Sequence, residues 1–527
     1  MPEKRLAPEL VTGDARDDHP LQGGSAAAAV AVGQTGAGAH VREGGAAAAV
    51  AGGRTDRLDP STRLVISLLL VSAFVVILNE TVMGVALPRI MEGLDVPATS
   101  AQWLTTAFML TMAVVIPISG FLLQRFNTRP VFLAAMSFFS LGTLLCAISP
   151  SFAALVLGRV VQATGTAIMM PLLMTTIMTL VPPHLRGRTM GNISIVMSVA
   201  PALGPTISGL VLSILDWRWL FWLVLPIALF SLGLGAARIR NVATTRPGSI
   251  DALSVLLSAT AFGGLIYGLS AMGSSVHGVQ AVQPWIPLAA GGVALVAFVL
   301  RQLALQRSDR ALLDLRTLLA PMFAVGVALM FVLMASLFGT IILLPIYTQD
   351  VLGLDPLSTG LLLLPGGLLM GLLGPVVGRV YDRRGPRVLV VPGAVLTSAA
   401  LWSMTLLGVS TPPVLVLAIH VVLSMGLGLM FTPLFTTSLG AVRPELYAHG
   451  SALVGTVQQL AGAAGTALFV VVMVTRAAGL TADGLAPEAA LAGGIRTAFL
   501  CGAVLSLLAV VAAFFVRRPE ETRSGSR

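Results

Sequence analysis

Long apolar segments recur from about residue 64 to residue 516, separated by short polar connections. A helix needs about 20 apolar residues to cross the hydrocarbon core of a bilayer. The pattern therefore predicts an all-α polytopic membrane protein with 14 transmembrane helices. The predicted spans are 64–87, 101–122, 130–149, 152–179, 190–214, 219–236, 252–272, 285–303, 321–345, 358–380, 388–408, 414–438, 450–475 and 497–516.

A ten-residue frame occurs twice, once after the second predicted span and once after the tenth. The first copy reads GFLLQRFNTR (120–129) and the second reads GRVYDRRGPR (378–387), so the copies start 258 residues apart. Glycine at the start of the frame allows helices to approach closely, and its arginines favour the anionic inner leaflet. Only the second copy is acidic. Asp382 can pair with an arginine or cap a helix, whereas Gln124 is limited to neutral hydrogen bonds.

Two further landmarks recur at nearly the same distance. Leu87-Pro88 and Leu344-Pro345, at the predicted ends of spans 1 and 9, are 257 residues apart. Gly204 and Gly465, in similar small-residue surroundings, are 261 residues apart. Parallel repeats of six spans describe a common transporter plan. The three pairs therefore predict two related six-helix bundles, with spans 7 and 8 inserted between them.

The repeat and the composition together define the expected domains. The first 60 residues hold Ala/Gly runs, scattered charges and no aromatic residue, and such a segment cannot bury enough apolar surface to order itself. The predicted domains are a disordered cytoplasmic tail (1–62), an N-terminal six-helix bundle (63–237), a linker with the two inserted helices (238–318), a C-terminal six-helix bundle (319–516) and a second cytoplasmic tail (517–527).

Charge adds a topology to this picture. Only 10% of residues are charged, against about 25% in a soluble domain, and the net charge is +9. Few arginines lie in the odd-numbered connections, and the positive-inside rule then places both termini in the cytoplasm, in a multi-pass protein of the cytoplasmic membrane. The positive charge is thus explained without nucleic acid. The even-numbered connections, on the cytoplasmic side, carry many more arginines than the odd-numbered ones: Arg125, Arg129, Arg186, Arg188, Arg238, Arg240, Arg246, Arg301, Arg307, Arg310, Arg316, Arg383, Arg384, Arg387 and Arg443.

Enzyme classes find no support in the sequence. No H-E-x-x-H, G-x-S-x-G, P-loop or paired histidine cluster occurs, so neither a catalytic site nor a nucleotide site is indicated. Cys146 and Cys501 lie in apolar runs and provide neither a disulfide framework nor a metal site. We therefore expect no cofactor, no metal and no obligate protein partner, and an ion gradient as the source of energy.

Few ionisable residues lie inside the predicted spans, and such residues are costly there unless they serve a function. Glu80 lies in the outer part of span 1 beside Asn79, and Arg159 lies within span 4. Burial favours the neutral form of a carboxyl, so Glu80 is our candidate proton carrier. Arg159, with Gln162 one turn further on, is expected to tune that carboxyl or to order water. The alternatives are an interfacial glutamate and a structural hydrogen-bond anchor between helices.

Other polar residues in the spans are weaker candidates. Gln162, Gln458, Gln459 and His420 are candidates to line a substrate cavity. A lone histidine is more commonly a hydrogen-bonded core residue than a ligand, and glutamines commonly join helices. A methionine-rich stretch, Met169 to Met178, suits either an adaptable substrate surface or the core.

The combination of motifs resembles the major facilitator superfamily, and within it the fourteen-span drug:proton antiporters, most of all the lincomycin-resistance branch of multidrug efflux proteins. The double loop frame is the superfamily's mark. Four segments of this chain are similar to the family's motifs in spans 1, 4, 5 and 6: ILNETVMGVALP (77–88), LVLGRVVQATG (155–165), GNISIVMSVAPALGPTISG (191–209) and WRWLFWLVLP (217–226).

The resemblance implies roles for three groups of residues. Proton coupling is implied for Arg159 and for the position of Asn79, where the family usually has an aspartate; Glu80, our candidate carrier, is its neighbour. The fifth-span antiporter motif is Gly204, Pro205, Ser208 and Gly209. The cytoplasmic gate comprises Gly120, Gln124, Arg125, Arg129, Gly378, Asp382, Arg383, Gly385 and Arg387, with Gln124 and Asn127 departing from the family's Asp and Gly.

The resemblance also implies an activity. We expect proton-coupled efflux of small amphipathic drugs or antibiotics by alternating access, with membrane lipids and protons as the other partners. An exporter of a self-made metabolite or lipid would use the same architecture and remains the alternative.

Overall fold

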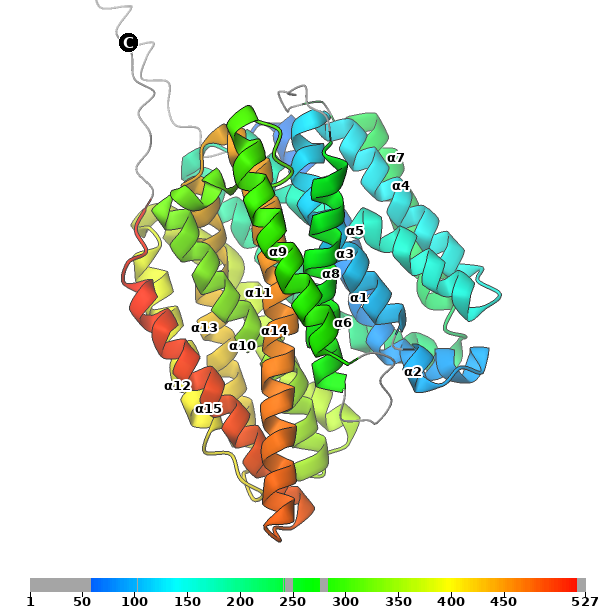
Figure 1. The fold of residues 1–527 in the computed structure, drawn as a ribbon, viewed down its shortest axis with the longest axis vertical. Helices are drawn as coiled ribbons and strands as arrows, with labels where there is room; N and C mark the ends of the chain where they lie inside the picture. The colour runs from blue at the N-terminus through cyan, green and yellow to red at the C-terminus, as the bar shows by residue number, and fades with distance from the viewer. Residues whose placement is uncertain (1–57, 102, 240, 242–249, 275–282, 519–527) are drawn as a thin grey trace, which may run out of the picture. The chain divides into compact units, whose positions relative to one another are not determined.

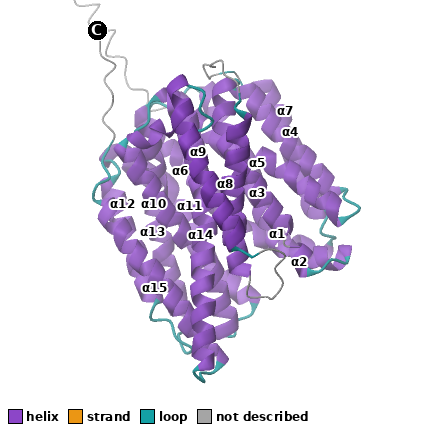
Figure 2. Cartoon of the chain, viewed as in Figure 1, coloured by secondary structure: helices purple, strands orange, loops and turns teal. Residues whose placement is uncertain are grey.

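The structure is a computed structural model that describes residues 58–101, 103–239, 241, 250–274 and 283–518. Over these residues the chain forms helices joined by short loops, with no strand (Figure 2). Fourteen of the helices are long and apolar enough to cross a membrane. The predicted fold class and number of spans are confirmed. Nearly all of the predicted N-terminal tail lies outside the described residues.

The N-terminal half of the fold contains six long helices. Their apolar side chains are spread around each helix and are not confined to one stripe, which suits helices that are covered by other helices on one face and by lipid on the other. Ser151 begins one of them, because its hydroxyl accepts the backbone N–H of Ala154. The helices are α1 (Pro60–Leu94), α3 (Trp103–Arg125), α4 (Thr128–Ala147), α5 (Phe152–Leu180), α6 (Arg186–Ile214) and α7 (Trp219–Arg238), with the single turn α2 (Ala98–Ala101) before α3.

The C-terminal half contains six more helices. Asp355 begins the second of them, because its carboxylate accepts the backbone N–H groups of Leu357 and Ser358. Hydrogen bonds from the Ser358 hydroxyl and from these N–H groups hold the pKa of Asp355 below its usual range. The helices are α10 (Pro321–Ile346), α11 (Pro356–Arg384), α12 (Arg387–Met404), α13 (Pro413–Gly440), α14 (Tyr447–Ala482) and α15 (Pro487–Ala513).

The two halves pack their helices in the same pattern. In the N-terminal half α4 packs on α5, α3 on α5, α1 on α6 and α4 on α7. The C-terminal half repeats these pairs in the same order: α12 with α13, α11 with α13, α10 with α14, and α12 with α15. The recurring glycines occupy matching places. A side chain at Gly204 would strike Thr81 of α1, and one at Gly465 would strike the backbone of Ala335 in α10. Each glycine therefore lets the fifth helix of its half approach the first.

The inserted pair, α8 (Ala252–Ser274) and α9 (Trp285–Leu305), lies over a seam between the halves. Helix α8 contacts both α3 and α14, and α9 packs on α8 (green in Figure 1). The rings of Trp103 and Tyr267 stack at 6.0 Å where α3 meets α8. The inserted helices thus touch both halves. The seam between α6 and α11 has no such cover among the described helices.

Polar side chains fix the base of this inserted pair. The guanidinium of Arg301 donates two hydrogen bonds, of 2.7 and 2.8 Å, to the carboxylate of Asp251. These bonds, with one from the Ser254 hydroxyl, hold the pKa of Asp251 well below its usual range. Gln302 bonds to Ser254 and accepts the backbone N–H of Leu312. The pair is therefore tied to the segment that leads into α10.

Several helices end later or begin earlier than predicted. Helix α1 continues through Pro88 to Leu94, and α10 continues past Pro345 into a π-helical turn, Tyr347–Val351. The proline landmarks therefore recur, but the prediction that they end their helices is wrong. A proline removes only one backbone hydrogen bond, and the turns beyond it are satisfied by their own ladder. Helix α15 likewise begins at Pro487, ten residues before the predicted start of its span.

We call one end of the helix bundle the arginine-rich end. There α3 and α11 end, and α6 and α14 begin. It carries exposed arginines, among them Arg125, Arg188 and Arg384.

Candidate functional site

A buried polar network occupies the N-terminal half, toward the end opposite the arginine-rich end. Arg159 in α5 is fully buried, and its Nη1 donates a hydrogen bond of 2.7 Å to Oε1 of Gln162. The amide of Gln162 in turn donates a bond of 2.7 Å to the hydroxyl of Thr143 in α4. The ring of Phe108 in α3 lies under the guanidinium, 4.0 Å from Cζ to the ring centroid. Three helices therefore hold one cation in place.

Glycines allow this network to form. A side chain at Gly142 would strike the backbone of Gln162, and one at Gly165 would strike the carbonyl of Ala135. Helices α4 and α5 therefore approach closely enough for Gln162 to reach Thr143. Cys146, a free buried thiol, packs against Gly158 at the same crossing and forms no disulfide.

Asn79 and Glu80 of α1 lie next to this network. Asn79 is buried, and its side-chain NH₂ has no hydrogen-bond partner among the described residues. Glu80 is half-buried and forms no hydrogen bond, and no ion pair within 4.0 Å, with another described residue. Helix α1 packs on α5, and the positive charge of Arg159 acts on the Glu80 carboxyl. The three predicted proton-coupling residues therefore lie in one region.

The predicted antiporter motif packs α6 against α1 beside Glu80. Gly204 is buried against Thr81, and the hydroxyl of Ser208 donates a 3.2 Å hydrogen bond to the backbone carbonyl of Val82. Gly209 is exposed and has open space around it. Pro205 lies within the same helix. The motif therefore supports the segment that carries Glu80, and the close contact is confined to Gly204 and Ser208.

The second copy of the loop frame joins the two halves. The carboxylate of Asp382, near the end of α11, accepts the backbone N–H groups of Gly187 and Arg188, each at 2.8 Å. These N–H groups belong to the first turn of α6, where the helix dipole favours an anion. Gly378 lies one turn earlier, with its backbone against that of Gly187. Asp382 thus caps a helix of the other half.

The other residues of this frame face outward or shape the turn. Arg383 and Arg387 are exposed. Gly385 has φ of +80°, a conformation that favours glycine, and it ends α11.

The first copy of the frame joins the halves with a neutral bond. The amide of Gln124 donates a 2.7 Å hydrogen bond to the backbone carbonyl of Glu445, just before α14. Gly120 is buried, and a side chain there would meet Ala452. Arg125 is exposed, and Arg129 donates a 2.6 Å bond to the carbonyl of Ala236 within its own half.

All hydrogen bonds between the two halves, among the described residues, lie toward the arginine-rich end. Besides the two frame contacts they join Thr175 to Ser451 at 3.1 Å and Ser194 to Thr432 at 2.6 Å. Arg186 reaches the hydroxyl of Tyr447 at 3.5 Å. The halves are therefore closed against each other at the arginine-rich end.

The cavity candidates are not brought together. Gln162 belongs to the Arg159 network, whereas Gln458 approaches the sulfur of Met334 at 3.8 Å within the C-terminal half. His420 packs against α11, where its Nε2 lies 3.2 Å from the carbonyl oxygen of Leu363. Gln459 is half-buried beside Gln458. Their expected role as lining of one cavity stays a prediction.

The methionine-rich stretch belongs to the interior. Met169, Met174 and Met178 are buried in the main hydrophobic core. This favours the packing interpretation over a substrate surface for these three residues.

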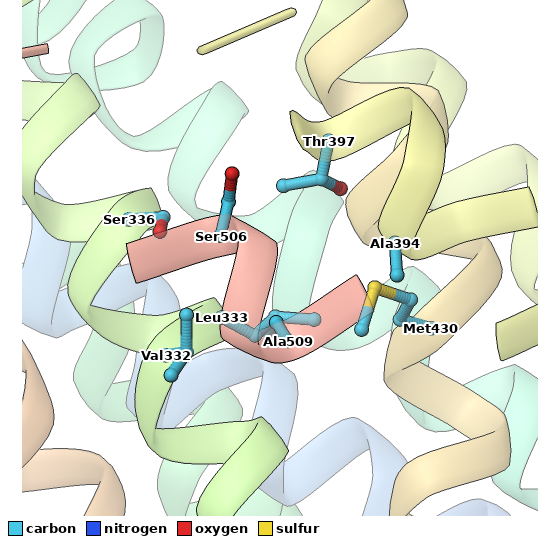
Figure 3. A pocket seen from close by; sticks show the side chains of 8 residues that line it. All are labelled: Val332, Leu333, Ser336, Ala394, Thr397, Met430, Ser506 and Ala509. Carbon is cyan, nitrogen blue, oxygen red and sulfur yellow. The ribbon is translucent and has the colours of Figure 1, made fainter. Parts of the chain in front are cut away.

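A small cavity lies inside the C-terminal half, between α10, α12, α13 and α15 (Figure 3). Its volume is about 10 Å³, which leaves room for at most about one water molecule. It is therefore too small for a drug-sized substrate. Its lining consists of Val332, Leu333, Ser336, Ala394, Thr397, Met430, Ser506 and Ala509.

Sequence reasoning missed two members of the polar network, Phe108 and Thr143. Nothing in their local sequence distinguishes them, because an aromatic or a threonine in an apolar helix is unremarkable until its neighbours are known. In the described part of the chain no group of three His, Cys, Asp or Glu side chains is arranged to hold a metal ion.

The chain is similar to known transport and resistance proteins. The lincomycin resistance protein LmrB of Listeria monocytogenes is 40% identical over 459 residues, which cover 86% of this chain and 96% of that protein. The multidrug resistance protein B homolog of Mycobacterium tuberculosis is 30% identical over 422 residues, 79% of this chain and 77% of that one. The expected likeness to the lincomycin-resistance branch is therefore confirmed.

The fold has solved counterparts. The crystal structure of the human organic anion transporter MFSD10 (TETRAN) superposes with a TM-score of 0.59 at 17% identity, covering 86% of this chain and all of that one (100%). The family model of the Major Facilitator Superfamily matches residues 69–466. With fourteen apolar helices, this multi-pass membrane protein belongs to the major facilitator superfamily of transporters.

Proposed function

We propose that this protein exports amphipathic drugs or antibiotics across the cytoplasmic membrane in exchange for protons. Its similarity to a lincomycin resistance protein and to a multidrug resistance protein homolog supports the substrate class. The arginine excess at one end of the bundle supports a cytoplasmic position for that end and for both termini.

One observation carries the proton coupling. Glu80 is the only acidic side chain in the interior of the fourteen described spans. The other acidic residues of these helices lie in an end turn or in the segments that flank the helices. Glu80 has no hydrogen-bonding partner among the described residues, and the Arg159 charge acts on it. An intramembrane carboxyl without a partner is able to take up and release a proton as its access changes.

The contacts between the halves support alternating access. The closed arginine-rich end is held by packing and by a few hydrogen bonds, two of them to Asp382. A neutral hydrogen bond contributes about 1 kcal/mol net and one to a charged group about 1.5–3 kcal/mol. Breaking these contacts would open a path to the cytoplasm. We propose that a proton enters from the opposite side and binds Glu80. Rocking of the two halves then opens the cytoplasmic end, where the proton leaves and substrate binds, and the return motion carries the substrate outward.

The test is efflux of lincomycin and of a cationic dye from cells that express the wild type or Glu80→Gln, with and without an uncoupler. We expect wild-type efflux to collapse with the uncoupler. Glu80→Gln should abolish uncoupler-sensitive efflux at equal expression, because glutamine cannot exchange a proton. Glu92→Gln is the matched control, since Glu92 lies on the same helix and is exposed. It should pump normally.

Two results would contradict the proposal. Concentrative efflux by Glu80→Gln would place proton coupling on another group. A wild type that moves neither compound would remove the drug-efflux assignment and favour a self-made metabolite or lipid as the substrate.

A further inference from the structure

A buried arginine and an intramembrane carboxyl lie in the same apolar region of this protein without forming an ion pair. Arg159 is fully buried, and its charge acts on the carboxyl of Glu80. Yet the two side chains form no ion pair within 4.0 Å. Whenever the carboxyl is ionised, its attraction to a nearby cation is strong in a medium of low dielectric constant. The other contacts of Arg159 therefore bear on whether the two groups can pair.

The contacts of Arg159 identify what holds it. Its Nη1 donates to Gln162, which is itself anchored to Thr143. The face of the guanidinium rests on the ring of Phe108, 4.0 Å from the centroid. Arginine stacks well on aromatic rings because its cation is planar and weakly hydrated. The hydrogen bond fixes one edge of the guanidinium, and the ring fixes its plane.

We propose that Phe108 is a positioning residue that keeps Arg159 from pairing with Glu80. The inference rests on the proposed function of Glu80 as the proton carrier. A direct ion pair would stabilise the carboxylate and would oppose its protonation. With Arg159 held on the Phe108 ring, its positive charge acts on the Glu80 carboxyl without forming an ion pair, and the carboxyl remains able to bind a proton.

Among the described residues around Glu80, no second charge competes with Arg159. Helix α1 packs on α2, α5, α6 and α7. Among the described residues of these helices Arg159 is the only charged side chain that acts on Glu80. From α4, the Cys146 thiol interacts with Arg159. A change in the titration of Glu80 on altering Phe108 can therefore be traced to Arg159.

The test measures proton binding at Glu80 directly, without relying on transport. A hydrophobic carbodiimide modifies protonated carboxyls within membranes, and mass spectrometry of the purified full-length protein gives the modified fraction of Glu80 at each pH. We expect Phe108→Leu to move the half-maximal pH of labelling downward by about one unit, because an opposite charge at contact distance favours the carboxylate. Phe108→Tyr keeps the ring and should behave as the wild type.

Two further variants guard the interpretation. Phe132→Leu makes the same change at another fully buried ring of this half, which contacts no guanidinium of the described residues, and should leave the labelling midpoint unchanged. Phe108→Met removes the ring while keeping similar volume, and it serves if Phe108→Leu does not fold. An unchanged midpoint in the folded Phe108 variants would overturn the proposal, and so would an equal shift in Phe132→Leu.

Transport separates this inference from the proposed function. Efflux measured on the same proteins should show the same downward shift in its half-maximal pH for Phe108→Leu. If labelling shifts while the wild type shows no proton-driven efflux, the positioning role stands and the proposed function fails. If efflux is proton-driven but neither midpoint moves, the proposed function stands and the role of Phe108 fails.

Discussion

The two copies of the loop frame lie at matching places but make opposite kinds of contact. In the C-terminal half, Asp382 accepts two backbone N–H groups at the start of α6. In the N-terminal half, Gln124 donates one bond to the carbonyl of Glu445 before α14. One copy sets an anion against a helix N-terminus, and the other joins two neutral groups. Charge-assisted hydrogen bonds are roughly twice as strong as neutral ones.

The glycines extend this difference along each seam. Between α6 and α11 the backbones touch, because Gly187 lies against Gly378 and Gly191 lies against Gly374. Between α3 and α14 the nearest neighbour of an added side chain at Gly120 is the methyl group of Ala452. The α6–α11 seam is therefore the tighter of the two, and it should contribute most of the free energy that closes the arginine-rich end.

The largest effect is expected at the acidic copy. Asp382→Asn removes the charge from the cap and replaces one acceptor with an NH₂ group that faces an N–H donor. Charged hydrogen bonds contribute about 1.5–3 kcal/mol, so the closed state should lose up to about a hundredfold in population. Efflux should fall severely, because the arginine-rich end would no longer close.

Chemical labelling checks this opening. Ser194, between the halves, is changed to cysteine in a protein that lacks Cys146 and Cys501, and a membrane-impermeant maleimide is added at the arginine-rich side. Labelling should rise when Asp382→Asn is added. Unchanged labelling together with normal efflux would mean that the cap does not control closure.

The sequence predicted these two positions and gave a helix cap as one of two roles for Asp382, but it did not indicate which groups they would touch. The spacing of the repeat placed Asp382 and Gln124 at equivalent helix ends, and the presence of one acid anticipated a stronger contact there. That Asp382 would cap α6 instead of pairing with an arginine depends on how two distant helices meet. No local pattern encodes that meeting, and the partner atoms are backbone N–H groups that every residue but proline carries.

In the candidate coupling site, too, some residues could be predicted from the sequence, whereas their contacts could not. Glu80 and Arg159 were predictable, because an ionisable residue in an apolar run is conspicuous. Phe108 is one of 21 phenylalanines, so its contact with Arg159 could be seen only in the packed helices. Helix ends were missed for another reason: length patterns describe the apolar part of a span, whereas α1 and α15 continue beyond it.

A second, smaller effect compares the seams by making the same change in each. A side chain at Gly191 would lie 2.3 Å from the carbonyl oxygen of Gly374, so Gly191→Ala must push α6 from α11. Overpacking of this kind costs about 1–3 kcal/mol. Gly120→Ala meets Ala452 at 3.0 Å, a contact that a small shift relieves. We expect Gly191→Ala to lower efflux several-fold and to raise labelling of the cysteine at position 194, and Gly120→Ala to do neither strongly. Equal effects would mean that the seams are equally tight.

The smallest effect is expected at the neutral copy. Gln124→Ala removes one hydrogen bond between uncharged groups near the surface, which contributes about 1 kcal/mol or less. The carbonyl of Glu445, once released, is near enough to the surface to be hydrated, so no buried group is left without a partner. Efflux should therefore fall by less than about fivefold, with little rise in labelling. If Gln124→Ala were as damaging as Asp382→Asn, the charge on the second copy would not explain the asymmetry, and both seams would have to bear closure equally.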